Sequence, residues 1–568
     1  MRIALGAYQP RVDERISSLL AGHASDRIWR RDATFWGGDA DRQRSVANRL
    51  GWLDVASQMR DRAGQIDAFA AQVRAGGFTG AVLLGMGGSS LAPEVLRQSI
   101  ADHVRGGWPK LHVLDTTDPA AILAVSEHID PARTLFFVSS KSGTTIEALS
   151  LFAYFHALVA EAKPGRAGEN FVAVTDAATP LEALAREHNF RHIFTNPGDI
   201  GGRYSVLSYF GLVPAAVAGV DVAKLLDRGM AAAADAHASA SDALRLGAAL
   251  GELALRGCDK CTFIVSPRIA SFGLWVEQLI AESTGKEGLG IVPVASEPFG
   301  TPAQYGDDRV FVQLRLEADS NGEEDALVGA LNAAGRPVIV IDLADVYDLG
   351  RAFFTWEFAV AVVGHVLGIN PFDEPDVRES KDNTSRVLQE FSESGKLDAS
   401  FVGDAGITVI AGGADVPQPS LRGVLEELFE AIGEGDYFAA TAYVQPTART
   451  QQAFDEIRTA VRDARHVATT LGYGPRFLHS TGQLHKGGPP RGVFLQVTAS
   501  DIRDITIPGR TPTFGQLKRA QSIGDFQSLV SHGRPVARVH LGADIESGLA
   551  QLTEAVRTVA AASAVAGR

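Results

Sequence analysis

Short apolar runs, rich in β-branched and aromatic residues, alternate with longer amphipathic segments along most of the chain. Apolar strands separated by helices are typical of βαβ units, whose parallel sheets are covered by helices on both faces. The pattern therefore predicts an α/β fold built on doubly wound parallel sheets. The predicted strands are residues 80–84, 111–114, 134–139, 171–174, 262–265, 310–314 and 337–341, and the predicted helices between them include 92–100, 145–161, 180–188 and 274–283.

This alternation occurs at least twice, over about residues 75–220 and 245–400, and an Ala-rich stretch at 230–249 predicts a connecting helix. A third set follows, with strands at 407–411, 437–444, 492–497 and 537–541 and helices at 421–432, 449–471 and 546–562. We predict four parts: an N-terminal helical extension (1–74), two doubly wound subdomains (75–245 and 246–400) and a C-terminal α/β region (401–568).

The longest apolar stretch, residues 353–369, contains Glu357 and His365 and ends in Gly368. It is too short and too polar to span a bilayer, and it predicts a buried helix. The N-terminus has no apolar segment followed by a cleavage site, so we expect a cytoplasmic protein.

Composition and charge narrow the classes of function. The 568 residues are 45% hydrophobic and 21% charged, with a net charge of -14, which is typical of a globular protein. An acidic chain is a poor candidate for binding nucleic acid or anionic membranes without specificity. The net negative charge is still compatible with a local basic pocket for a small phosphorylated ligand.

Cysteine and histidine give little sign of a metal or redox centre. Cys258 and Cys261 form a lone C-x-x-C without the second pair that a structural zinc site needs, and a turn leading into the strand at 262–265 is the favoured interpretation over a redox motif. His188 and His192 lack an evident third ligand. We expect no metal and no cofactor.

The first segment with candidate chemistry is residues 81–90, where a buried strand runs into the turn Gly85-Met86-Gly87-Gly88-Ser89-Ser90 and then a helix. Glycines let backbone N–H groups approach an anion, and the helix N-terminus adds partial positive charge. A dinucleotide site is the alternative, supported by Asp115 at the end of the next strand but weakened by Ser90 at the third glycine position.

The second segment favours phosphate. Strand 134–139 runs into Ser140-Lys141-Ser142-Gly143-Thr144-Thr145 and a helix, which gathers hydroxyls, an ammonium and a helix N-terminus in one loop. In a parallel sheet this loop and the glycine-rich loop both emerge at the carboxyl ends of strands, where ligands bind. Together they predict a phosphosugar site.

Two further segments carry one charged candidate each. Arg203, in Gly201-Gly202-Arg203-Tyr204-Ser205, could stabilise an oxyanion without exchanging protons, or could merely pair with a carboxylate. Glu282 lies in the last turn of a predicted helix, on its mostly apolar side, where the helix dipole and desolvation raise a carboxyl pKa. That placement suits a general base, although a carboxylate reaching solvent at a frayed helix end is the alternative. Glu277 points the other way and is predicted to be solvated.

Taken together, these segments resemble the glucose-6-phosphate isomerase family, whose core is two sugar-isomerase (SIS) subdomains. The resemblance covers about residues 75–385 and includes Glu282-Ser283-Thr284-Gly285-Lys286 and the segment 372–381, which ends in Lys381. The segment 479–488 is similar to the isomerase half of bacterial transaldolase/phosphoglucose isomerase fusions. The chain is too short for an additional barrel of ~250 residues, so we expect a stand-alone isomerase.

The resemblance implies a role for each matching residue. Glu282 would move a proton between C1 and C2 of the sugar through an enediol, Arg203 would hold the enediolate charge, and Lys381 would assist ring opening. The residues implied in binding the 6-phosphate are Gly87, Gly88, Ser89, Ser140, Lys141, Ser142 and Thr145. The family also implies a homodimer that needs no cofactor. A phosphosugar substrate is the only other binding partner that we expect. Glu374 stands where relatives often carry glutamine, which puts its contact with substrate in doubt.

One departure concerns ring opening. The family's histidine-bearing segment is matched here to residues 300–308, which hold Tyr305 and no histidine. Tyr305, His479 or His485 is hypothesised to substitute, the alternative being that those histidines only order the glycine-rich loop. Two other functions also stay open: a non-catalytic phosphosugar-binding protein, and an isomerase that also acts on mannose 6-phosphate.

Overall fold

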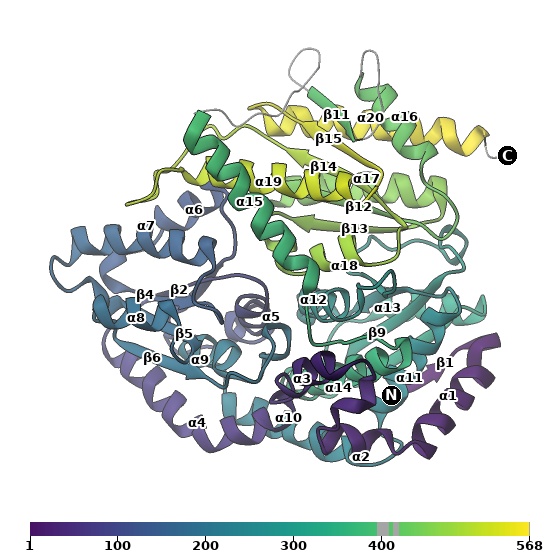
Figure 1. Cartoon of the computed structure of the whole chain (residues 1–568), viewed down its shortest axis with the longest axis horizontal. Coiled ribbons are helices and arrows are strands. Elements are labelled where there is room, and N and C mark those ends of the chain that lie inside the picture. Colours follow the sequence, from purple (N-terminus) through teal and green to yellow (C-terminus); the bar gives the residue numbers. More distant parts are fainter. Residues whose placement is uncertain (395–407, 413–419, 567–568) are drawn as a thin grey trace.

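The computed structural model describes residues 1–394, 408–412 and 420–566, and these form three five-stranded sheets with helices around them (Figure 1). The predicted α/β class is confirmed. The first sheet, at the left of Figure 1, has the order β3-β2-β4-β5-β6, with all strands parallel. Its strands are β2 (Gly80–Gly85), β3 (Lys110–Leu114), β4 (Thr134–Ser139), β5 (Phe171–Asp176) and β6 (His192–Asn196).

The second sheet has the order β1-β10-β9-β7-β8. Its parallel strands are β7 (Lys260–Val265), β8 (Val292–Val294), β9 (Arg309–Leu316) and β10 (Val338–Leu343). The N-terminal strand β1 (Arg2–Ala4) pairs antiparallel with β10. The beginning of the chain therefore completes a sheet whose other strands lie more than 250 residues away.

The third sheet repeats this plan in the order β11-β15-β14-β12-β13, at the top of Figure 1. Its strands are β11 (Thr408–Gly412), β12 (Tyr437–Tyr443), β13 (Ala468–Tyr473), β14 (Gly492–Thr498) and β15 (Val536–His540), and only β11 is antiparallel. In each of the three sheets, the first parallel strand in the chain (β2, β7 or β12) lies between the second and the third parallel strands. The connections reverse direction there, and such switch points are where parallel sheets bind ligands.

The helices cover these sheets on both faces. In the N-terminal part and first unit they are α1 (Gln9–Ala21), α2 (Ala24–Trp29), α3 (Ala40–Ala47), α4 (Trp52–Ala75), α5 (Leu91–Ser99), α6 (Pro119–Ser126), α7 (Ile146–Ala162), α8 (Pro180–Glu187) and α9 (Tyr209–Val217). The middle of the chain forms α10 (Val222–Ala236), α11 (Asp242–Leu255), α12 (Phe272–Thr284), α13 (Gly322–Ala333), α14 (Leu349–Leu367) and α15 (Pro375–Ser394). The third unit, defined here as the third sheet and its helices (residues 408–412 and 420–566), holds α16 (Leu421–Glu430), α17 (Ala448–Arg465), α18 (Gly482–Gly487), α19 (Phe514–Ser531) and α20 (Ile545–Ala566).

The predicted buried helix is α14, which packs against α10 and α11 in the largest apolar core and ends at Gly368 with φ +73°. The predicted single helix over 230–249 is wrong, because α10 and α11 are separate. Ser241 begins α11 by accepting a hydrogen bond from the Leu244 amide, which ends one helix and starts the next.

The third unit holds two further differences from the sequence prediction. The helix predicted over 449–471 ends at Arg465, and β13 begins at Ala468 after a left-handed His466. Residues 468–473 pair with β12 along its length, so sheet pairing overrides the helical pattern there. Helix α19 was not predicted, although it is largely buried between the third sheet and α15.

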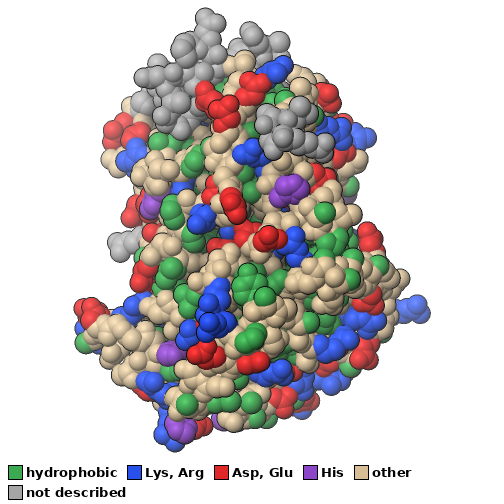
Figure 2. Space-filling view, turned by 90° about the vertical axis from the view of Figure 1, so that its right-hand side faces the viewer, with side chains coloured by type: hydrophobic (Ala, Val, Ile, Leu, Met, Phe, Trp, Pro, Cys, Tyr) green, Lys and Arg blue, Asp and Glu red, His purple; other side chains and the backbone are tan. Residues whose placement is uncertain are grey.

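The structure shows how charge is distributed on one face of the molecule (Figure 2) and where the two cysteines lie. On the face shown in Figure 2, acidic and basic side chains are interspersed, and among the described side chains neither sign forms a continuous patch. Within the described residues, no helix has the length and apolarity to cross a membrane. Cys258 and Cys261 are buried free thiols, and burial raises the pKa of Cys258 to about 12, which disfavours a redox role.

Candidate active site

The glycine-rich loop after β2 is shaped by close backbone approaches. Gly87 has φ +53°, and a Cβ there would lie 2.7 Å from the His479 carbonyl oxygen and 2.9 Å from the Gln278 Nε2 atom. A Cβ on Gly88 would lie 2.0 Å from the Gly202 carbonyl oxygen. The two glycines therefore let the loop contact both the Arg203 loop and the third unit, which no larger residue would allow without a shift.

The second loop, after β4, is ordered by its own hydroxyls. The Ser140 and Thr145 hydroxyl oxygens lie 2.8 Å apart, and the Gly143 amide donates to the Ser140 hydroxyl at 3.1 Å. The Lys141 ammonium binds the Asp176 carboxylate and donates to the Gly198 carbonyl oxygen at 3.1 Å. An anion on this loop would therefore meet hydroxyls and the N-terminus of α7, while the charge of Lys141 is shared with Asp176.

Arg203 is the most completely enclosed cation of the site, with a side chain that is 1% exposed. Its Nη1 atom lies 3.2 Å from a Glu282 oxygen and 3.0 Å from a Glu374 oxygen. Nε donates to the Ser283 hydroxyl, and Nη2 donates to the backbone carbonyls of residues 371 and 373. Burial alone would lower the pKa of Arg203, but the two carboxylates hold this pKa above its ordinary value.

Glu282 lies in the last turn of α12, as the sequence predicts, and its other oxygen accepts a hydrogen bond from Gln278 Nε2 at 2.9 Å. Burial raises the pKa of Glu282; Arg203 opposes this rise and Glu374 adds to it. A buried carboxylate with a raised pKa, held in place by Arg203 and Gln278, has the properties of a general base.

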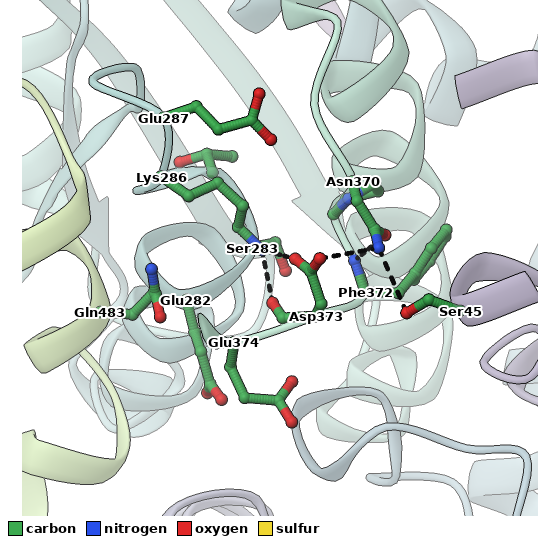
Figure 3. Close-up of polar contacts among 12 residues, drawn as sticks. Ser45, Glu282, Ser283, Lys286, Glu287, Asn370, Phe372, Asp373, Glu374 and Gln483 are labelled. Atoms are coloured by element: carbon green, nitrogen blue, oxygen red, sulfur yellow. Dashed lines mark hydrogen bonds and ion pairs between the residues drawn. The ribbon is translucent and has the colours of Figure 1, made fainter. Parts of the chain in front are cut away.

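The loop after α14 holds Glu374 against the site (Figure 3). Lys286 donates to both the side chain and the backbone carbonyl of Asp373, and its Nζ atom lies 2.7 Å from the carboxylate. Asn370 donates to the other Asp373 oxygen at 2.9 Å and contacts Ser45 at 3.5 Å. Figure 3 shows the Glu282 and Glu374 carboxylates pointing toward the same side of this loop.

The third unit contributes His479 to the site. Its Nε2 atom lies 3.0 Å from Glu147 Oε1, and its backbone carbonyl accepts from Gln278, the residue that also binds Glu282. Gln521 of α19 donates to the same Glu147 oxygen at 2.7 Å. Burial would raise the pKa of Glu147, but His479 and, more weakly, the exposed Lys381 of α15 hold it below its ordinary value.

The alternative dinucleotide site is not supported. Asp115, which would have bound a ribose, accepts two hydrogen bonds from Arg476 of the third unit at 2.7 and 2.8 Å and one from Ser90 at 3.1 Å. This carboxylate therefore anchors the segment that ends in His479.

Two of the three hypothesised ring-opening groups lie elsewhere. The Tyr305 hydroxyl accepts from the Gly300 amide, and its ring lies near Arg309 and Arg462, which are not site residues. His485 is buried among Tyr437, Phe477 and Phe494. Of the three, the structure brings only His479 to the candidate site.

The prediction that Glu277 is solvated is wrong. It is 8% exposed, and burial raises its pKa to about 8. The third unit covers this side of α12 with Arg458 and Arg476, which the periodicity of one helix does not reveal. Among the described residues no group of three or more His, Cys, Asp and Glu side chains is arranged to hold a metal ion.

Comparison with known proteins places this geometry in a family. A family model described as phosphoglucose isomerase matches residues 13–290. A glucose-6-phosphate isomerase of Rubrobacter xylanophilus is 32% identical over 361 residues, which cover 55% of this chain and 83% of that protein. The chain belongs to the phosphoglucose isomerase family. A probable glucose-6-phosphate isomerase of Haloarcula marismortui is 31% identical over 350 residues, covering 54% of this chain and 78% of that protein.

Solved structures agree on the fold of the phosphoglucose isomerase family. A hypothetical protein of Thermus thermophilus aligns with a TM-score of 0.57 and 26% identity over 68% of this chain and 99% of its own. A glucose-6-phosphate isomerase of Chlamydia trachomatis shares the fold, with a TM-score of 0.51 and 21% identity over 65% of this chain and 79% of its own. The family match at 13–290 includes Arg203 and Glu282, whereas Lys381 and His479 lie beyond it.

Proposed function

We propose that this chain interconverts glucose 6-phosphate and fructose 6-phosphate by proton transfer through an enediol, with Glu282 as the base. The observation that carries the proposal is the contact between Glu282 and Arg203, both buried, beside two loops suited to a phosphate. Glu282 would take the proton from C2 of the open-chain aldose and return it to C1. Arg203 would stabilise the oxygen charge that develops in between.

The remaining residues of the proposed site would bind and prepare the sugar. The 6-phosphate would lie on the loops with Gly87, Gly88 and Ser89 and with Ser140, Lys141, Ser142 and Thr145. We propose that His479 opens the sugar ring, with Lys381 assisting, because Glu147 fixes the imidazole by a 3.0 Å contact. The third unit would then supply one catalytic side chain to a site built mainly by the first two.

The family resemblance also bears on the oligomeric state of the protein and on its place in the cell. We propose a cytoplasmic homodimer, on the strength of the resemblance alone. Sedimentation of the purified chain should give about twice its mass of 60.2 kDa, and a monomer would contradict this part of the proposal.

The direct test is turnover of the purified chain. Incubation with fructose 6-phosphate in the presence of EDTA should produce glucose 6-phosphate, because proton transfer by Glu282 needs no metal. A parallel assay with mannose 6-phosphate tests whether the chain also isomerises this second sugar. Binding of fructose 6-phosphate without turnover would identify a non-catalytic phosphosugar-binding protein instead.

Replacing His479 by Gln should lower kcat about 10²-fold on the equilibrium mixture of cyclic sugar, as expected when one general acid–base group is lost. Proton exchange between C2 of an open-chain substrate analogue and solvent, which Glu282 performs alone, should change much less. His485→Gln provides the comparison for a histidine of the same segment outside the site. Equal losses in both assays would rule out a specific role in ring opening.

The acid limb of kcat/KM should report the ionisation of Glu282, which must be deprotonated to accept a proton. Because burial and the neighbouring Glu374 raise the pKa of Glu282, activity should begin to fall at a pH above the ordinary carboxylate range. Glu374→Gln removes one like charge and should shift this limb to lower pH. A limb that stays in place in Glu374→Gln would show that another group controls it.

A further inference from the structure

The turn that follows α12 brings Lys286 to the base of the candidate active site. Glu287 and Gly288 both have positive φ, +58° and +76°, and together they reverse the chain. The Gly288 amide donates to the Gly487 carbonyl oxygen of the third unit at 2.9 Å, which docks the turn on that unit. The backbone of Lys286 is therefore held in place four residues after Glu282.

The Lys286 side chain ties this turn to the loop after α14 (Figure 3). It is 2% exposed, donates to the Asp373 carbonyl oxygen, and lies 2.7 Å from the Asp373 carboxylate. Arg203 Nη2 donates to the same Asp373 carbonyl oxygen at 2.9 Å. One carbonyl group therefore joins the two cations, and the next residue, Glu374, forms an ion pair with Arg203.

The Asp373 side chain is held less tightly than the lysine that binds it. Its carboxylate is 41% exposed, and its other oxygen accepts a hydrogen bond from Asn370 at 2.9 Å. Because Asn370 belongs to the same loop, this contact does not connect the loop to α12. Without Lys286 the carboxylate could turn toward water, and the loop would lose a direct connection to the turn after α12.

The charged groups on the outer side of Lys286 have partners of their own. Lys286 and Asp373 line a cavity of about 470 Å³ together with these groups. The partners are Arg42 for Glu287, Gln483 for Asp376, Asp525 for Lys486, Glu379 for His532, and the backbone carbonyls of residues 485, 486 and 488 for Arg534. The ion pair of Lys286 is with Asp373, so each of these two groups neutralises the other.

On its inner side Lys286 acts on the charge of the proposed base. Burial and the nearby Arg203 lower the pKa of Lys286 to about 8, so the ammonium is still charged in the acidic range where Glu282 titrates. This positive charge lowers the pKa of Glu282, whereas burial and Glu374 raise it. Loss of the Lys286 charge should therefore make Glu282 a stronger proton acceptor that is protonated at higher pH.

We propose that Lys286 is a positioning residue for the isomerisation. By binding Asp373 it fixes the loop that presents Glu374 and two backbone carbonyls to Arg203, and it neutralises a carboxylate that would otherwise compete for that guanidinium. Arg203 then keeps its charge for Glu282 and for the oxygen on which charge develops. This inference rests on the proposed function, to which it adds a residue that acts only through its neighbours.

Two substitutions at Lys286 separate its charge from its size. Lys286→Gln removes the charge, and Lys286→Arg keeps it, with the adjoining cavity leaving room for the longer side chain. With fructose 6-phosphate, Lys286→Gln should lower kcat about 10- to 100-fold, the scale on which small misplacements act, and should change KM little. The acid limb of kcat/KM should move to higher pH, opposite to the shift expected for Glu374→Gln. Lys286→Arg should restore most of kcat and the wild-type limb.

Lys260→Gln is the matched control. Lys260 is equally buried, binds Asp259 and Asp308, and lines a different cavity that contains none of the proposed site residues. Both Gln variants should lower the thermal midpoint, but only Lys286→Gln should lower kcat and shift the acid limb. A wild-type kcat and limb in Lys286→Gln, or equal losses in Lys286→Gln and Lys286→Arg, would overturn the inference. Should Lys286→Gln not fold, Asp373→Asn removes the same ion pair at a partly exposed position, and a wild-type kcat there would overturn it as well.

A titration of the base without substrate separates this inference from the isomerase activity. The carboxyl ¹³C resonance of Glu282, identified by its loss in Glu282→Gln, reports the pKa of this residue. This pKa should rise in Lys286→Gln and stay unchanged in Lys260→Gln. If the wild type does not convert fructose 6-phosphate but the pKa rises, the proposed function fails and the placement of Lys286 is supported. An unchanged pKa in Lys286→Gln would overturn the inference whatever the turnover.

Discussion

Replacing Glu282 by Gln is expected to lower kcat for fructose 6-phosphate by about 10²–10⁴-fold, the contribution typical of a positioned general base. The amide keeps the size of the side chain and can still contact Arg203 and Gln278, but it cannot accept the proton. KM should change far less than kcat, because the proposed phosphate contacts come from other loops.

Glu277→Gln is the matched control for this variant. Glu277 lies on the same helix, is equally buried, and has its pKa raised to about 8, so it is largely protonated at neutral pH. Its amide replacement should therefore leave kcat close to that of the wild type. If Glu282→Gln retained full activity, the base would lie on another residue, and the assignment of Glu282 would be wrong.

Replacing Arg203 by Met is expected to damage both activity and stability. It would leave Glu282 and Glu374 without their shared cation and the carbonyls of residues 371 and 373 without a donor. Removing one member of a buried ion pair typically costs about 3–5 kcal/mol of unfolding free energy. Loss of a preorganised oxyanion donor should also lower kcat about 10²–10³-fold.

Denaturant unfolding and steady-state kinetics measure the two effects separately. Arg203→Lys keeps the charge but not the fork that binds Glu282, Glu374 and Ser283 together, so it should recover part of the stability and little of kcat. Arg557→Met removes an exposed ion pair with Glu456 and should change little. An Arg203→Met variant with wild-type kcat would show that Arg203 is only structural.

The local pattern of apolar and polar residues was sufficient to predict the strands and the helix that carry the candidate site. The strands predicted at 134–139 and 80–84 correspond to β4 and β2, because apolar β-rich runs bounded by glycine or serine leave few alternatives. Glu282 lies where helical spacing places it, near the end of α12. Motif order then indicated the family, which comparison with known proteins confirms over residues 13–290.

Other features depend on contacts between distant segments, which no local pattern encodes. β1 completes the second sheet by pairing with β10, and Glu277 is buried because the third unit covers α12. His479 could not be chosen over Tyr305 and His485 from sequence, since only the docking of Arg476 on Asp115 brings it to Glu147.

The amino-acid sequence was therefore enough for the α/β class, and it also indicated the proposed phosphate loops and the proposed base, since each depends on residues close together in the chain. The tertiary structure decided which groups surround them. It placed Arg203 between Glu282 and Glu374, and it supplied His479 from the unit that contains the third sheet. The physical reason is that burial and charge pairing arise from side chains that meet only when the three sheets pack together.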